Sequence, residues 1–112
     1  MEGIVEFSDW EKLNLIVAQI IRVEEIDGAD KLYKITLDIG NDEERIVCAG
    51  LKKYYSKEDL QNKKVVLFEN LCPRKLKGIE SRGMILAACS ENHEKVSLII
   101  PDADAEVGGK IS

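Results

Sequence analysis

Histidine, proline and aromatic residues are scarce in this 112-residue sequence, which has one histidine, two prolines and 5% aromatic residues. No segment reaches the roughly 20 apolar residues that a membrane-spanning helix needs. Residues 1–12 are acidic and lack the basic-then-apolar order of a secretion signal. The sequence therefore predicts neither a transmembrane helix nor export, and a cytoplasmic location is expected.

Cysteine is also infrequent, at Cys48, Cys72 and Cys89. An odd number argues against a disulfide framework, and each cysteine lies in or beside an apolar run, which indicates reduced and packed thiols in a cytosolic protein. Metal binding needs clustered ligands, and Cys89 with His93 is the nearest approach to a cluster. The sequence therefore predicts no metal site.

Signatures of catalysis and of cofactor binding are missing as well. His93 is the single histidine and falls in an expected hairpin loop, without a neighbouring Ser/His/Asp or Cys/His arrangement. No phosphate-binding loop or dinucleotide fingerprint is present. The acidic residues 42–44 are typical of a solvated turn. We therefore expect a protein that is not an enzyme and that needs no cofactor.

Positive charge is concentrated in one part of a chain whose net charge is −5. Residues 1–30 contain eight acidic residues against two basic ones, whereas residues 63–82 contain six basic residues against two acidic ones. Residues 91–112 are acidic again. Phosphates respond to the local potential, so an acidic molecule can still present one positive face. A charge run of this kind is also compatible with ordinary solvated surface.

Hydrophobic alternation predicts short strands at residues 14–26, 31–39, 44–49, 64–69, 83–89 and 95–100. The apolar parity shifts near Ile20 and Ile21, which indicates a bulge. In the second strand Leu32, Ile35, Leu37 and Ile39 mark the apolar side, with Tyr33 as the exception. Ser56 followed by Asp59 predicts the start of a short helix over residues 56–60.

This order of elements indicates one all-β domain over residues 1–112. The core is expected at about 13–100, with terminal extensions at 1–12 and 101–112. Five or six strands, a short helix between the third and fourth, and no βαβ alternation match the OB-fold barrel, although other small barrels have similar strand patterns. The fold alone does not assign a function.

Residues 70–82 form an expected basic loop that leads into an apolar strand. Arg74, Lys75 and Lys77 can meet phosphates, and arginine can also stack on a base. Asn70 and Ser81 offer neutral hydrogen-bonding groups. The alternative is a solvated loop whose leucines and Met84 pack into the core.

The stretch NLCPRKLKGIESRGMILAA, residues 70–88, resembles the signature of the tRNA-binding domain appended to methionyl-tRNA synthetases, which also occurs as a free-standing dimeric protein. Residues 29–33 resemble that family's "ADKL" turn, and residues 45–51 its "R-x-I-V-x-G" strand end. Tyr55 and Leu60 match its short helix. The resemblance covers roughly residues 13–90 in the correct order.

The resemblance implies an OB-fold, tRNA as the ligand, no catalysis in the domain, usually a homodimer, and a role in assisting aminoacylation beside a synthetase. The residues that correspond to RNA contacts are Lys31, Arg45, Asn70, Arg74, Lys75, Lys77, Ser81, Arg82 and Met84. Asn14 stands where the family usually has an acid, Ile16 where it often has arginine, Gly28 where it has proline or asparagine, and Asn62 where glycine is common.

Four further expectations concern partners, stacking and the organisation of the chain. Apolar residues near both ends are candidates for a dimer interface, unless they pack on their own barrel: Ile4, Val5, Phe7, Trp10, Leu13, Val107 and Ile111. Because aromatics are few, base stacking is limited to residues such as Tyr33 or Phe68. Some proteins with this barrel resemble export chaperones, so peptide binding is the alternative function. The initial methionine favours a free-standing chain.

Overall fold

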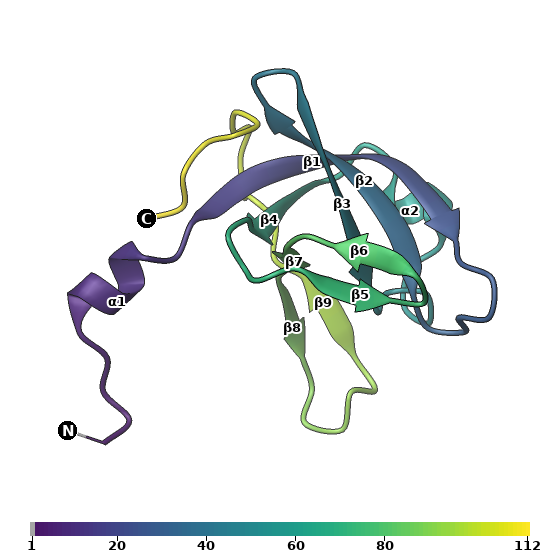
Figure 1. Ribbon diagram of the computed structural model, residues 1–112, viewed down its shortest axis with the longest axis horizontal. Coiled ribbons are helices and arrows are strands. Elements are labelled where there is room, and N and C mark those ends of the chain that lie inside the picture. Colours follow the sequence, from purple (N-terminus) through teal and green to yellow (C-terminus); the bar gives the residue numbers. More distant parts are fainter. Residues whose placement is uncertain (1) are drawn as a thin grey trace.

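The computed structural model describes residues 2–112 and is built mainly of strands (Figure 1). One curled antiparallel sheet has the order β3 (Glu43–Ala49), β2 (Tyr33–Gly40), β1 (Leu15–Glu25), β4 (Lys64–Phe68) and β7 (Met84–Ile85). Two separate ladders join β5 (Arg74–Leu76) to β6 (Ile79–Ser81), and β8 (Ala87–Cys89) to β9 (Val96–Leu98). Helix α1 spans Phe7–Glu11 and helix α2 spans Lys57–Leu60. This is the predicted OB plan, with its helix between β3 and β4.

Strand β1 is long enough to serve two neighbours. Its first half pairs with β4, and its second half pairs with β2. The register shifts between Ile20 and Arg22, which confirms the predicted bulge. The Ile20 carbonyl accepts the N–H of Asn62 at 3.0 Å, so the loop after α2 satisfies the backbone where the ladders change over.

The core lies inside the curled sheet. Ile35 and Leu37 of β2 are fully buried there. Tyr33 is only 5% exposed and belongs to the same cluster, so the prediction that Tyr33 breaks the alternation was wrong. Its ring has the parity of Ile35, and its hydroxyl can be buried because it donates to the Tyr55 carbonyl at 2.9 Å. Leu32 instead packs against a second cluster.

Helix α2 is held by the capping box that the sequence predicts. Ser56 Oγ accepts the N–H of Asp59 at 3.1 Å, and the Asp59 carboxylate accepts the N–H of Ser56 at 3.3 Å. Leu60 at the end of the helix is fully buried in the core. Asn62 follows with φ of 66°, a left-handed conformation that asparagine tolerates. This explains why asparagine can replace the family's usual glycine.

The basic stretch is more ordered than predicted. Residues 70–82 were expected to form a loop, but they contain the hairpin β5–β6, in which Leu76 pairs with Ile79. Its turn is Lys77-Gly78, with φ of 51° and 82°, as in the primed turns whose twist matches that of the strands. The predicted strand 83–89 is divided at Leu86 into β7 and β8, because β8 leaves the sheet to pair with β9.

The two terminal extensions differ in how they are held. Helix α1, which was not predicted, projects away from the barrel (Figure 1). The C-terminal segment runs along the first half of β1, with hydrogen bonds of 2.7 Å from Gly108 to Val17 and 2.8 Å from Ile111 to Leu15. Neither helix within residues 2–112 is long and apolar enough to cross a membrane.

Candidate nucleic-acid interface

The hairpin β5–β6 is seated firmly on the outside of the barrel. Leu76 and Ile79 pack with Leu32 on a small cluster formed by the buried residues Ile26, Ala29 and Cys48. Ser81 is 2% exposed, and its Oγ accepts the N–H of Cys48 at 2.9 Å. The N–H of Arg82 donates to the Ile46 carbonyl at 3.0 Å. A side-chain cluster and cross-strand hydrogen bonds therefore fix the basic hairpin to β3.

Three cations of the hairpin are exposed, but they do not share one face. Arg74 pairs with Ser81, and Lys75 with Glu80. Because side chains alternate along a strand, Arg74 lies on the same side as the packed Leu76, while Lys75 faces away. Lys77 occupies the turn. Among residues 2–112, no ion pair involves Arg74, Lys75 or Lys77.

Lys31 is brought to the tip of the hairpin by the fold. It lines a pocket of about 380 Å³ together with Lys77 and residues 28–32. The turn before β2 and the turn of the hairpin therefore place two exposed lysines around one hollow. Asp30 lines the same pocket, so one carboxylate stands beside the two lysines and the positive potential of the hollow is modest.

Arg82 lies on another side of the hairpin, in a groove of about 480 Å³ that it shares with Lys34, Arg45 and Ile46. Its Nε is 3.5 Å from Glu80, and both side chains are more than half exposed, so water screens this pair. Lys34 was not among the predicted contacts. Its outward position on β2 follows from the alternation, but its place beside the hairpin depends on tertiary packing.

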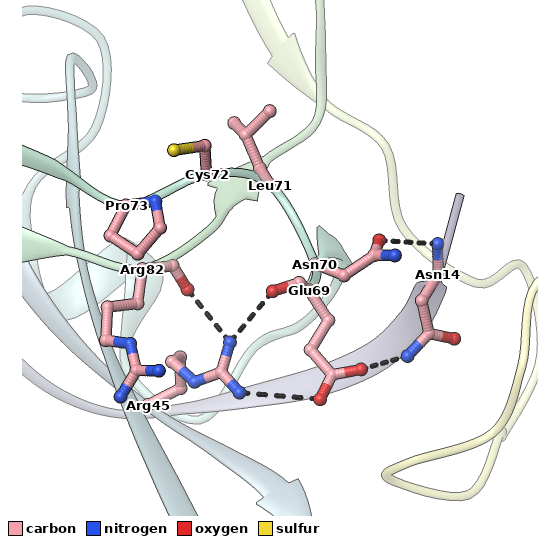
Figure 2. A pocket seen from close by; sticks show the side chains of 8 residues that line it. All are labelled: Asn14, Arg45, Glu69, Asn70, Leu71, Cys72, Pro73 and Arg82. Atoms are coloured by element: carbon pink, nitrogen blue, oxygen red, sulfur yellow. Dashed lines mark hydrogen bonds and ion pairs between the residues drawn. The ribbon is translucent and has the colours of Figure 1, made fainter. Parts of the chain in front are cut away.

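Arg45 makes a network at the end of the barrel, inside a pocket of about 450 Å³ (Figure 2). Its Nη1 donates to the carbonyls of Glu69 at 2.9 Å and Arg82 at 3.0 Å, and its Nη2 lies 3.4 Å from Glu69 Oε1. The Arg45 side chain is 16% exposed. Its guanidinium therefore joins the end of β4 to the start of β7.

Asn70 extends this network to the N-terminal segment. Its Oδ1 accepts the N–H of Asn14 at 2.7 Å, and its Nδ2 donates to the Lys12 carbonyl at 2.7 Å. The Asn14 amide in turn donates to the Glu69 carboxylate (Figure 2). An acid at position 14 would bring two carboxylates together, so the family departure at Asn14 suits its partner. Ile16 is 6% exposed and lies in the core.

Met84 and two of the three cysteines lie beside Arg74. Met84 is 41% exposed and lines a cavity with Arg74, Cys48 and Cys89. Cys48 is buried, whereas Cys72 and Cys89 are exposed free thiols, so the prediction of packed thiols was wrong for these two. Within residues 2–112, no three His, Cys, Asp or Glu side chains gather as they do around a metal ion.

The environment of Cys48 predicts its reactivity. Burial raises the pKa of the Cys48 thiol, and the nearby cations of Lys34 and Arg74 oppose this only in part. Because the thiolate is the nucleophile, we expect Cys48 to be alkylated by iodoacetamide more slowly than Cys72 and Cys89 at pH 8. Mass spectrometry of timed samples would measure the three rates. Equal rates would contradict the buried position.

Lys77 occupies a conformation that favours other residues. A non-glycine residue in the left-handed region is strained by about 1 kcal/mol, and asparagine before glycine is preferred in this turn. Lys77→Asn is therefore expected to raise the free energy of unfolding by about 0.5–1 kcal/mol while it removes an exposed cation. Urea unfolding would measure the first effect and tRNA titration the second. A destabilised Lys77→Asn variant would contradict the turn assignment.

Comparisons with known proteins agree with the resemblance found in the residues. Residues 15–110 match the family model described as "Putative tRNA binding domain". The chain is 50% identical to a methionine–tRNA ligase of Thermococcus onnurineus over 107 residues, which are 96% of this chain and 14% of the ligase. It is 46% identical to that of Caldanaerobacter subterraneus over 108 residues, 96% of this chain and 16% of the ligase.

Two solved structures have the same fold over the full chain. The MetRS-related protein from Pyrococcus horikoshii has a TM-score of 0.91 at 33% identity, with 100% of both chains covered. The chaperone CsaA from Bacillus anthracis has a TM-score of 0.88 at 25% identity, with 98% of this chain and 100% of that chain covered. The curled sheet, the seated basic hairpin and the match over residues 15–110 agree, and the chain belongs to the tRNA-binding domain family that is also found in methionine–tRNA ligases.

Proposed function

We propose that this chain binds tRNA through the cations on and around hairpin β5–β6, and that it catalyses no reaction itself. These cations lie on more than one side of the hairpin and are together called the basic hairpin face: Lys31, Lys34, Arg74, Lys75, Lys77 and Arg82. The observation that carries the proposal is the hairpin: Arg74, Lys75 and Lys77 are exposed, in no ion pair of residues 2–112, and mounted on a fixed element. A rigid cationic ridge on a chain of net charge −5 favours contact with phosphates at this place.

Phosphate contacts are expected to outweigh base stacking. Tyr33 is buried in the core and is not accessible to a base. Phe68, at the end of β4, is half-buried and exposes only part of its side chain for stacking. The other expected contacts divide by role. Ser81 holds the hairpin, Arg45 holds the barrel end, and Asn70 holds the N-terminal segment. We therefore assign a positioning role to these three residues. Recognition then depends on the shape of the tRNA backbone more than on its sequence.

A salt series tests the proposal directly. If about four cations meet phosphates, the logarithm of the association constant should fall with the logarithm of salt concentration with a slope near −3. Filter binding of an unmodified tRNA between low and physiological salt would measure it. A slope near zero would contradict binding through this face.

Removing two cations should weaken every tRNA to a similar degree. Arg74→Ala with Lys75→Ala is expected to lower the affinity about 10-fold and to make the salt slope less steep by about two, because phosphate contacts carry little sequence information. The matched control is Lys12→Ala with Lys110→Ala, which removes the same charge at exposed positions of the N-terminal and C-terminal segments. Equal losses in both double variants would point to net charge alone.

We further propose that the chain forms a homodimer. Ile4, Val5 and Phe7 are 65%, 75% and 71% exposed, and they lie on or before the projecting helix α1. Apolar side chains this exposed gain free energy by packing against a partner. Two tRNA sites in one particle would strengthen weak binding if one tRNA reaches both. A strict monomer in sedimentation at tens of micromolar would contradict the dimer.

Association with a methionine–tRNA ligase is the biological setting that we propose. The chain spans only 14% of the Thermococcus onnurineus ligase, so it would assist aminoacylation either as a segment of such an enzyme or as a separate subunit. Both arrangements place it in the cytoplasm. Co-purification from the native cell, with sequencing of bound RNA and identification of bound proteins, would separate them.

Peptide binding is the second candidate, favoured by the similarity to the chaperone CsaA and by the exposed apolar N-terminal segment. The two candidates differ in competition. A tRNA-binding protein releases labelled tRNA when unlabelled tRNA is added and keeps it when denatured polypeptide is added. A chaperone binds denatured polypeptide and ignores added tRNA.

A further inference from the structure

A cavity of about 270 Å³ opens beside the basic hairpin. One wall is the end of β3 and the loop that follows it, and the opposite wall is formed by β7 and the β8–β9 hairpin. Figure 1 shows β8 and β9 standing away from the rest of the barrel, below β5 and β6. Because β8 leaves the main sheet after Leu86, the β8–β9 hairpin and the end of β3 form the walls of a hollow beside the basic hairpin.

The floor of this cavity is apolar and uncharged. Leu51 and Cys48 are 5% and 7% exposed. The half-buried Ile85 of β7 and Ala87 of β8 also line the cavity. Burial raises the pKa of the Cys48 thiol, so it stays protonated at neutral pH. A flat, weakly polar group can replace water on such a surface with a favourable change in free energy.

The mouth of the cavity is fixed and carries positive charge. The Tyr54 hydroxyl donates to the His93 carbonyl at 2.7 Å, which ties the loop after β3 to the β8–β9 turn, and both residues line the cavity. Arg74 lines the same cavity, is exposed, and takes part in no ion pair among residues 2–112. Met84, 41% exposed, adds a polarisable side chain.

We propose that this cavity binds one unstacked nucleobase of the bound tRNA, with Arg74 holding the phosphate beside it. RNA-binding proteins take splayed-out bases into apolar sites and hold the adjoining backbone with cations. The occupant is identified by continuity: Arg74 belongs both to the basic hairpin face and to the lining of the cavity, so RNA held by Arg74 passes the opening. The inference rests on the proposed function and adds a site that reads a single-stranded position of the tRNA.

The test fills the cavity without changing charge. Ala87→Leu places a larger side chain in the lining and is expected to weaken tRNA binding about 10-fold, within the range for one stacked base. The salt slope should not change, because the phosphate contacts remain. Met84→Ala serves as a second variant, since it trims an exposed side chain, and a loss of several-fold is expected.

Abasic tRNAs identify the base. A set of tRNAs that each carry one abasic position in a single-stranded region would be titrated against the unsubstituted protein and Ala87→Leu. At one position, removing the base should lower the affinity of the unsubstituted protein about as much as Ala87→Leu lowers its affinity for intact tRNA. The same abasic tRNA should bind Ala87→Leu almost as tightly as intact tRNA does. This non-additivity shows that the base and the cavity interact. Thermal unfolding of both variants checks that each remains folded.

Three results would overturn the inference, and they differ from failure of the proposed function. Wild-type affinity with an unchanged salt slope in both variants would show that no base enters. The same conclusion would follow if, at every abasic position, the loss of affinity from the missing base simply added to the loss from Ala87→Leu. Loss of denatured-polypeptide binding in Ala87→Leu, with tRNA binding intact, would assign the cavity to an apolar peptide side chain. The proposed function itself fails only if the unsubstituted protein shows no salt-dependent tRNA binding.

Discussion

Gly83→Ala is expected to lower the free energy of unfolding by about 3 kcal/mol. Gly83 has φ of 133°, a conformation that side chains rarely adopt, and a Cβ there would lie 2.9 Å from the Phe68 carbonyl oxygen and 3.1 Å from Leu67 Cδ1. The first of these atoms belongs to the backbone of β4 and cannot rotate away. The change therefore strains the point where the chain leaves the basic hairpin and enters β7.

Urea unfolding followed by circular dichroism would measure this loss. The matched control is Gly50→Ala, because Gly50 is exposed and a Cβ there meets nothing within 4 Å. We expect Gly50→Ala to raise the free energy of unfolding by less than about 1 kcal/mol, because alanine lowers the conformational entropy of the unfolded chain. A Gly83→Ala variant as stable as Gly50→Ala would show that β7 does not approach β4 as described.

Arg45→Ala is expected to cost about 2 kcal/mol of folding free energy, because it removes a guanidinium that satisfies two carbonyls and one carboxylate. Its side chain is 16% exposed and that of Glu69 is 25% exposed, so water replaces these contacts only in part. Arg45→Lys should recover little of the loss, since lysine cannot reproduce the planar fork.

This prediction separates a positioning role from a phosphate contact. If Arg45 only holds the barrel end, Arg45→Ala lowers stability and leaves the salt slope of tRNA binding unchanged at a temperature where the variant is folded. Arg22→Ala is the control, because Arg22 is 59% exposed in its pair with Glu24 and should cost less than about 0.5 kcal/mol. A less steep salt slope with unchanged stability would place Arg45 on the RNA instead.

Most of the barrel could be predicted because its signals are local. Alternation along β2, the capping box of α2 and the parity shift near Ile20 each depend on neighbours in the sequence. The β5–β6 hairpin could not be predicted in this way. Its strands have three residues each, and its Lys77-Gly78 turn lacks the asparagine or aspartate that usually announces such a turn. Helix α1 is also short, with five residues, and could not be predicted from periodicity either.

The candidate site was predicted in its residue types and less well in its arrangement. The motif of residues 70–88 places most cations on one hairpin, but strand parity turns Arg74 and Lys75 to opposite sides. Lys31 joins them from the turn before β2 and Lys34 from β2 itself, which no pattern along residues 70–88 can reveal. Arg45 opens the motif of residues 45–51 and Ser81 lies in the motif of residues 70–88, yet their hydrogen bonds to the backbone give both of them structural partners.

The sequence by itself determined the class of this protein: hydrophobic periodicity selects the strands, a capping box starts the helix, and the ordered motifs identify the tRNA-binding family. Only the tertiary structure decided which cations stay free and where a cavity opens. Periodicity depends on backbone geometry repeated every few residues, whereas charge pairing and cavities depend on contacts between distant segments. Glu69 neutralises Arg45 while no carboxylate reaches Arg74 among residues 2–112, and this difference comes from packing alone.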